Sequence, residues 1–99
     1  MKLYIALELS NRKWKLAFCT GDTIRLINID ARDIVAFAQA LQTTCQKWGL
    51  NQDVRIYSVY EAGRDGFWIH RWLERLGLDN VIVDPASIEV NRRKRRAKT

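Results

Sequence analysis

Ninety-nine residues with 47% hydrophobic side chains predict one small folded domain, and they exclude a largely disordered chain. Six of the 17 Lys and Arg lie in the last eight residues, so residues 1–91 hold 11 basic and 11 acidic side chains. The body of the chain is neutral and the net charge of +6 belongs to its tail. This distribution favours local contact with a polyanion over a uniformly basic surface.

Cysteine usage and hydropathy indicate the cellular compartment in which the protein is expected. Cys19 and Cys45 lie far apart, with no His or Cys at metal-ligand spacing, so we expect two reduced, half-buried thiols. The N-terminus shows no cleavable signal pattern, and no apolar run approaches the roughly 20 residues that a membrane span requires. We therefore expect a cytoplasmic protein.

Hydrophobic alternation predicts three N-terminal strands joined by short turns. In residues 3–9, leucine and isoleucine alternate with Tyr4, Ala6 and Glu8, which places Glu8 on the face opposite the leucines. A second strand follows the turn at residues 10–12 and covers residues 13–18, with Trp14 on its apolar face. After the turn at residues 20–22, a third strand covers residues 23–29. We expect these strands to form an antiparallel meander.

A helix is expected over residues 31–48. Asp30 is interpreted as its N-cap, with Asp33 adding negative charge to the first turn, where the helix dipole favours it. Gly49 supplies the C-terminal stop. The apolar stripe expected to pack on the sheet has spacings of three and four and consists of Ile34, Phe37, Ala38, Leu41, Cys45 and Trp48.

Two strands and a second helix complete the chain. The fourth strand covers residues 54–60 and reaches Glu61 at its carboxyl end. A helix over residues 65–76 follows; its buried stripe is Trp68, Ile69, Trp72, Leu73 and Leu76, and its water-facing side is His70, Arg71, Glu74 and Arg75. The last strand begins near Asn80, and its Val81–Val83 run is typical of a strand covered on both faces. We expect all four tryptophans to belong to the core rather than to a base-stacking surface.

The order of elements is three strands, helix, strand, helix, strand. A meander followed by two right-handed crossovers predicts an α/β fold with a mixed five-stranded sheet, and ribonuclease H-like domains are built in that order. In that arrangement the first and fourth strands are neighbours, which brings Glu8 and Glu61 together at one edge of the sheet. Two carboxylates on neighbouring strands can hold a hard divalent cation.

The stretch YEAGRDGFWIHRWLERLGLDNVIVDPASIEVNRRKRRAKT resembles the N-terminal, RuvC-like domain of the DEDD insertion-sequence transposases, the family related to the Piv DNA invertase. Some of its members are bridge-RNA-guided recombinases, and the resemblance extends from YIALELS through the tail. It implies a ribonuclease H-like fold, four acids (D, E, D, D) that bind Mg²⁺, and a serine nucleophile from a separate C-terminal domain. It also implies Mg²⁺-dependent cleavage and rejoining of DNA during transposition, with insertion-sequence ends and target DNA as partners, a guide RNA in some members, homo-oligomers and a place at the bacterial nucleoid.

Only part of the family's metal site matches this chain. Glu61 matches the second acid, in the E-A-x-G pattern, and Glu8 falls at the first acid, which is usually Asp. The extra methylene moves the carboxylate oxygens by more than ~1 Å, and a small misplacement costs heavily in rate. The last two acids follow a K-T-D motif in the family, and this chain ends at Lys98-Thr99. We therefore expect residues 1–90 to be an incomplete domain followed by a basic tail over residues 91–99, and the chain to be catalytically silent by itself.

Each candidate residue also has a simpler interpretation. Glu61 can cap the following helix, and Glu8 can be a solvent-facing strand residue. Asp84 is expected to form the turn before Pro85 rather than to join the site. Arg64 can contact a phosphate of the nucleic acid, or it can form a local ion pair with Asp65. The single histidine is expected to face solvent rather than to transfer protons.

The tail is the independent signal for nucleic acid. The cations expected to contact phosphates, with little sequence selectivity, are Arg92, Arg93, Lys94, Arg95, Arg96 and Lys98. The alternative for this segment is a solvated, partly disordered terminus, or the start of a helix. Two other functions stay open: a non-catalytic RNA- or DNA-binding module, and a phosphotransferase of the actin-like superfold. The second is disfavoured because the turn at residues 10–13 has no glycine to cradle a phosphate.

Overall fold

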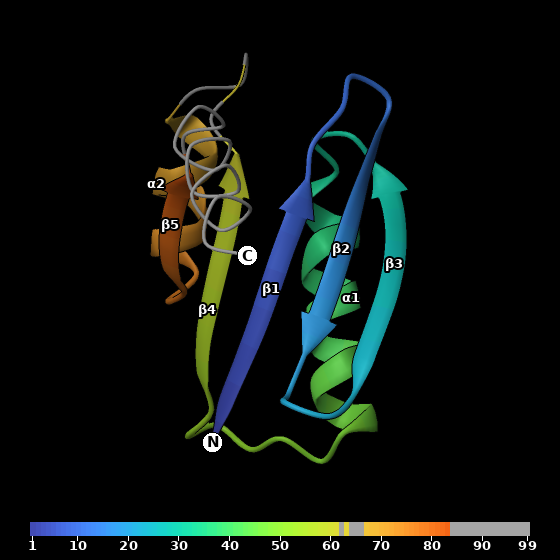
Figure 1. Cartoon of the computed structure of the whole chain (residues 1–99), viewed down its shortest axis with the longest axis vertical. Helices are drawn as coiled ribbons and strands as arrows, with labels where there is room; N and C mark the ends of the chain where they lie inside the picture. Colours follow the sequence, from blue (N-terminus) through green and yellow to red (C-terminus); the bar gives the residue numbers. More distant parts are fainter. Residues whose placement is uncertain (62, 64–66, 84–99) are drawn as a thin grey trace, which may run out of the picture.

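A computed structural model describes residues 1–61, 63 and 67–83. Their elements are, in chain order, β1 (Lys2–Glu8), β2 (Lys13–Cys19), β3 (Ile24–Asp30), α1 (Ile34–Lys47), β4 (Arg55–Glu61), α2 (Trp68–Arg75) and β5 (Asp79–Val83). The strands form one five-stranded sheet in the order β3-β2-β1-β4-β5 (Figure 1). β1, β2 and β3 are antiparallel neighbours, whereas β4 runs parallel to β1 and β5 parallel to β4. The mixed sheet, the meander and the predicted pairing of the first and fourth strands are therefore confirmed.

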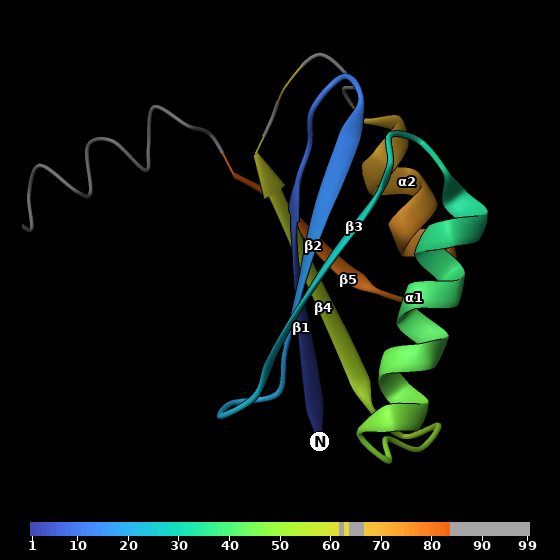
Figure 2. The same cartoon turned by 90° about the vertical axis from the view of Figure 1, so that its right-hand side faces the viewer.

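Both helices pack on the same face of the sheet, so the described part of the chain has two layers (Figure 2). The core lies between them, because alternate residues of the strands point toward the helices. At its centre Trp14 of β2 is fully buried and contacts the tryptophans of α2, with ring centroids 6.2 Å from Trp68 and 6.3 Å from Trp72. Phe37 of α1 meets Trp72 edge-on at 4.8 Å. These rings join both helices to the meander, in an arrangement that contributes about 0.5–1.5 kcal/mol per aromatic pair beyond the buried area.

The start of α1 differs from the sequence prediction. Asp30 is the last residue of β3 and pairs with Lys13 of β2, so it is not the N-cap. Asp33 takes that role, because its Oδ1 accepts a hydrogen bond from the backbone N–H of Ala36 at 3.0 Å. Between the strand and the cap, Arg32 adopts a positive φ of 64°. The sheet pairing extends the strand to Asp30 and so delays the helix.

The buried stripe of α1 is also rotated from the predicted one. Phe37 is fully buried as expected, but Ala40 and Thr44 are the other buried residues of the helix. Ile34, at 47% exposure, and Ala38 are exposed, so their assignment to the stripe was wrong. Thr44 tolerates burial because its Oγ1 donates to the carbonyl oxygen of Ala40, at 2.8 Å.

The C-terminal elements are less enclosed than the sequence indicated. On α2, Ile69 and Leu73 are fully buried, but Trp68 is 38% exposed and Leu76 45% exposed. Val81 of β5 is 59% exposed, so the described residues cover this strand on its helix side only. The prediction of a strand covered on both faces is wrong for this part of the chain.

The structure also bears on the expectations for the cysteines and for membrane-spanning segments. Both cysteines are free and partly buried, as predicted. In the described ranges, no helix is long and apolar enough to cross a membrane. Arg64, Asp65, Asp84, the basic tail and the boundary near residue 90 lie outside the described residues.

Candidate functional site

Glu8 and Glu61 end two neighbouring strands. β1 and β4 are parallel, and their paired residues run up to Leu7 opposite Tyr60, so the next residue of each strand is one of the two glutamates. Leu7 and Tyr60 are buried toward the helices, and the alternation of the strands therefore places both glutamates on the opposite face. Both are exposed. The topology thus brings together the two acids that are 53 positions apart in the sequence.

We call this opposite face the open face, because no helix of the described residues covers it (Figure 2). Lys15 of β2 lies across from Glu8, and Val83 of β5 lies across from Glu61. Beyond Lys15, the Nζ of Lys13 forms an ion pair with Asp30 at 2.5 Å. The pair of carboxylates therefore has one cationic neighbour and one apolar neighbour on the adjacent strands.

Two adjacent carboxylates fit part of a site for a hard divalent cation. Mg²⁺ is bound through one or two carboxylates while it keeps several waters, so Glu8 and Glu61 can serve as its protein ligands. Within residues 1–61, 63 and 67–83, no group of three or more His, Cys, Asp and Glu side chains is placed to hold a metal ion. Glu8 and Glu61 are thus two carboxylates that the described strands set side by side, without a third ligand beside them in the described ranges.

A polar cluster that the sequence analysis missed lies on the other face of the sheet, beneath α2. Ser58 and Asn80 are buried on neighbouring strands, and the Ser58 hydroxyl donates to Asn80 Oδ1 at 2.7 Å. The Asn80 side-chain amide lies 2.9 Å from His70 Nδ1, and the backbone N–H of Asn80 donates to Glu74 Oε1 at 3.3 Å. His70 Nε2 lies 3.7 Å from the same Glu74 oxygen.

His70 is therefore half-buried and hydrogen-bonded, and its predicted place in solvent is wrong. The physical reason is the phase of α2: with Ile69 and Leu73 pointing into the core, His70 borders β5. The sequence held one signal for the cluster. Ser58 shares the inward parity of Ile56 and Tyr60, and a polar residue at such a position needs a buried partner.

The two cysteines occupy different environments. Burial raises the pKa of the Cys45 thiol, so the protonated form is favoured there and the nucleophilic thiolate is disfavoured. Cys19 lies on the open face, where its Sγ is 3.8 Å from the carbonyl oxygen of Gly21. Neither thiol lies beside the two glutamates, and the described geometry gives neither a catalytic role.

The chain is 36% identical to "Putative transposase y4rJ" of Sinorhizobium fredii, over 104 aligned residues. This similarity supports a relationship with transposases. The alignment covers 98% of this chain and 26% of that protein, so the chain spans about a quarter of the length of the curated relative it matches. No family model matches the chain. No solved structure matches it either.

Proposed function

We propose that this chain forms part of the catalytic domain of a DNA transposase, and that Glu8 and Glu61 supply two carboxylates of its Mg²⁺ site. The observation that carries the proposal is the parallel register of β1 and β4, which puts both acids in one row of the open face. The similarity to "Putative transposase y4rJ" supports the reaction class. The order of strands and helices is that of ribonuclease H-like domains, which supports that assignment of the fold.

When bound, the metal ion would stabilise the negative charge that develops on a phosphodiester group and position the attacking oxygen. The sheet holds Glu8 and Glu61 in place for this role. The pairing of β1 with β4 fixes their backbones, and the exposure of both side chains leaves the carboxylates accessible to a cation. Lys15, across from Glu8, offsets part of the negative charge, so we expect weak cation binding by these two acids alone.

Manganese titration of the whole chain tests the metal site. Mn²⁺ is a paramagnetic substitute for Mg²⁺, and we expect it to broaden backbone amide signals at the carboxyl ends of β1 and β4, with a dissociation constant of about 0.1–1 mM. Glu61→Gln and Glu8→Gln keep the side-chain size and remove one charge each, so each should reduce the broadening at a given Mn²⁺ concentration. Asp53→Asn is the matched control, because Asp53 is an exposed acid in the turn before β4, at the opposite end of that strand.

Broadening that survives Glu8→Gln and Glu61→Gln, or that responds equally to Asp53→Asn, would overturn the assignment of these two ligands. If Glu61→Gln reduces the broadening and Glu8→Gln does not, then of the two acids only Glu61, which matches the family pattern, is a metal ligand.

The proposal assigns DNA contact to the tail, Arg92, Arg93, Lys94, Arg95, Arg96 and Lys98. Six cations that neutralise phosphates would give log K a slope of about −5 against log salt for duplex DNA. Fluorescence anisotropy of labelled duplexes compares the whole chain with a chain that ends at Val90. We expect the shorter chain to lose most of its affinity and most of its salt dependence, with little difference between duplex sequences. Equal affinity of the two chains would refute a role of the tail.

A further inference from the structure

The row of the open face that holds the two acids has a different neighbour on each side. The strand register gives this row, which we call the site row, as Asn28 of β3, Lys15 of β2, Glu8 of β1, Glu61 of β4 and Val83 of β5. On the β2 side, Glu8 lies across from the exposed Lys15. On the β5 side, Glu61 lies across from the apolar Val83. Among the described residues of the row, a polyanion at the acids therefore meets a cation in one direction only.

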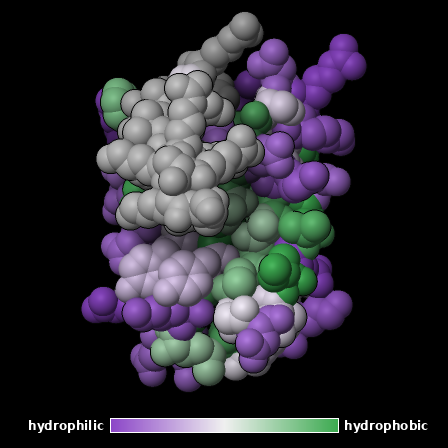
Figure 3. Space-filling model, in the orientation of Figure 1, coloured by the Kyte–Doolittle hydropathy of each residue, from purple (hydrophilic) through white to green (hydrophobic). Residues whose placement is uncertain are grey.

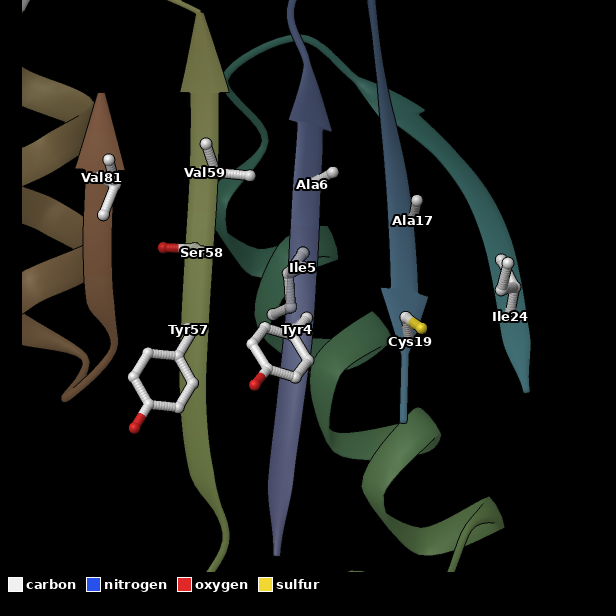
Figure 4. A pocket seen from close by; sticks show the side chains of 10 residues that line it. All are labelled: Tyr4, Ile5, Ala6, Ala17, Cys19, Ile24, Tyr57, Ser58, Val59 and Val81. Atoms are coloured by element: carbon white, nitrogen blue, oxygen red, sulfur yellow. The ribbon is translucent and has the colours of Figure 1, made fainter. Parts of the chain in front are cut away.

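The adjacent rows of the open face do not suit a phosphate backbone. The next row is uncharged and consists of Leu26, Ala17, Ala6, Val59 and Val81, and Figure 4 shows its alanines and valines on neighbouring strands. The row beyond it ends in an exposed acid, Asp79, which lies across from Tyr57. In Figure 3, hydrophobic atoms gather across the middle of the face and hydrophilic atoms surround the β1–β2 turn. Because phosphate oxygens bind cations and hydrogen-bond donors, the site row favours a path across the strand ends over a path down the strands.

The cations at the start of β2 differ in their partners. Lys13 Nζ lies 2.5 Å from Asp30 Oδ1, so this charge is already balanced. In the described ranges, the Lys15 side chain forms no ion pair and no hydrogen bond. The same holds for Arg12, which is exposed in the turn before β2. Ammonium and guanidinium groups without an acidic partner are available for phosphate oxygens.

We propose that the DNA strand bound at the two acids continues over β2, with one backbone phosphate at the ammonium of Lys15 and a further phosphate at the guanidinium of Arg12. This inference rests on the proposed function, which provides the DNA and the cation at Glu8 and Glu61. Two carboxylates balance a divalent cation, so Lys15 leaves the occupied site row with a net positive charge for the negative phosphodiester. Both glutamates stay accessible to the cation, because the DNA backbone contacts the neighbouring strand.

Lys15 also repels a divalent cation at Glu8, and this repulsion gives the proposal a distinctive signature. Opposed residues of antiparallel strands have Cα atoms about 5 Å apart, so the ammonium and the cation lie on the order of 6 Å apart. At physiological salt, Lys15→Ala should therefore strengthen cation binding about two- to fourfold. The same substitution removes a phosphate contact and should weaken DNA binding. The two affinities are thus expected to change in opposite directions, whereas a loss of folded structure would weaken both.

Fluorescence anisotropy of a labelled duplex of arbitrary sequence, with the whole chain in EDTA, tests the phosphate contact without a metal ion. We expect Lys15→Ala to weaken binding about five- to tenfold at about 0.1 M salt, and to reduce the slope of log K against log salt by about 0.9. Arg12→Ala should act in the same direction. Lys15→Arg keeps the charge and should bind within about twofold of the original chain.

Lys2→Ala is the matched control. Lys2 is an exposed lysine at the opposite end of β1, and its loss changes the net charge by the same amount. We expect it to weaken duplex binding less than about twofold. Backbone amide signals of the whole chain then locate the DNA: shifts caused by the duplex should be larger over residues 12–15 than over β5. Larger shifts on β5, or equal losses of affinity in Lys15→Ala and Lys2→Ala, would overturn the proposal.

Manganese titration of the same variants separates this inference from the proposed function. If Glu8→Gln and Glu61→Gln leave the Mn²⁺ broadening unchanged while Lys15→Ala weakens duplex binding, the metal assignment fails and the contact at Lys15 stands. If the glutamate variants lose the broadening while Lys15→Ala leaves duplex affinity unchanged, the metal site stands and the DNA path over β2 is refuted. A Lys15→Ala chain that binds both Mn²⁺ and the duplex more weakly would assign Lys15 to the stability of the fold and refute the proposal as well.

Discussion

Asn80→Ala will destabilise the fold by about 2–3 kcal/mol, because it removes the centre of the buried cluster beneath α2. Asn80 is 8% exposed and Ser58 is 3% exposed, and the hydrogen bond between them is 2.7 Å long. Without the amide, the Ser58 hydroxyl is left buried with no acceptor, and His70 loses its partner at 2.9 Å. An unsatisfied buried polar group costs about 1–3 kcal/mol, and the substitution creates one beside a small cavity.

Ser58→Ala will cost less, about 1–2 kcal/mol, since only Asn80 Oδ1 loses its partner. In the double variant both ends of the hydrogen bond are absent, so the two costs will not add. We expect a coupling free energy of about 1 kcal/mol between the two positions.

Urea denaturation followed by tryptophan fluorescence measures these free energies. With a slope of about 1–2 kcal/mol per molar urea for a domain of this size, Asn80→Ala should lower the midpoint by about 1–3 M. Asn28→Ala, at an exposed position of β3, is the matched control and should cost less than about 0.5 kcal/mol. The reasoning fails if Asn28→Ala and Asn80→Ala cost the same, or if the Ser58 and Asn80 costs simply add.

Other predictions concern the cap of α1, the end of α2 and the buried thiol. Asp33→Ala removes the side-chain acceptor of the Ala36 N–H and should cost about 1 kcal/mol in urea denaturation; a change below 0.2 kcal/mol would argue against the cap. Gly77→Ala should cost about 1 kcal/mol because Gly77 has a φ of +89°, although an added Cβ would meet no atom within 4 Å. Cys45 should react with iodoacetamide more slowly than free cysteine at pH 8, because burial raises its pKa. The same shift makes the folded chain hold a proton that the unfolded chain loses above about pH 8.5, so stability should fall as pH rises through that region and Cys45→Ser should remove this part of the fall.

Strand positions were predictable from the sequence because their signal is local. The alternation of Leu3, Ile5 and Leu7 with Tyr4, Ala6 and Glu8 matches the observed burial of β1 residue by residue. Pairing of β1 with β4 followed from the order of elements and the right-handedness of crossovers. The juxtaposition of Glu8 and Glu61 was therefore predictable, since it depends only on strand ends and topology.

Features that depend on contacts between distant elements were not predictable. The apolar spacing of α1 fits two neighbouring stripes, and only its packing against the sheet selects Ala40 and Thr44 over Ile34 and Ala38. The bond between His70 and Asn80 requires the phase of α2 and the register of β5 together. Val81 shows a limit of hydropathy: its apolar run predicted a strand covered on both faces, but Val81 is 59% exposed.

The register between β1 and β4 also determines to which face of the sheet Glu61 points. A slip of one residue would turn every side chain of β4 to the other face of the sheet. Glu61 would then point beneath the helices, where a carboxylate without a partner is costly, and Tyr60 would leave the core. The slipped register is therefore less stable than the observed one. The strand alignment that buries Tyr60 therefore also sets Glu8 and Glu61 side by side, so the stability of the core fixes the placement of the two carboxylates.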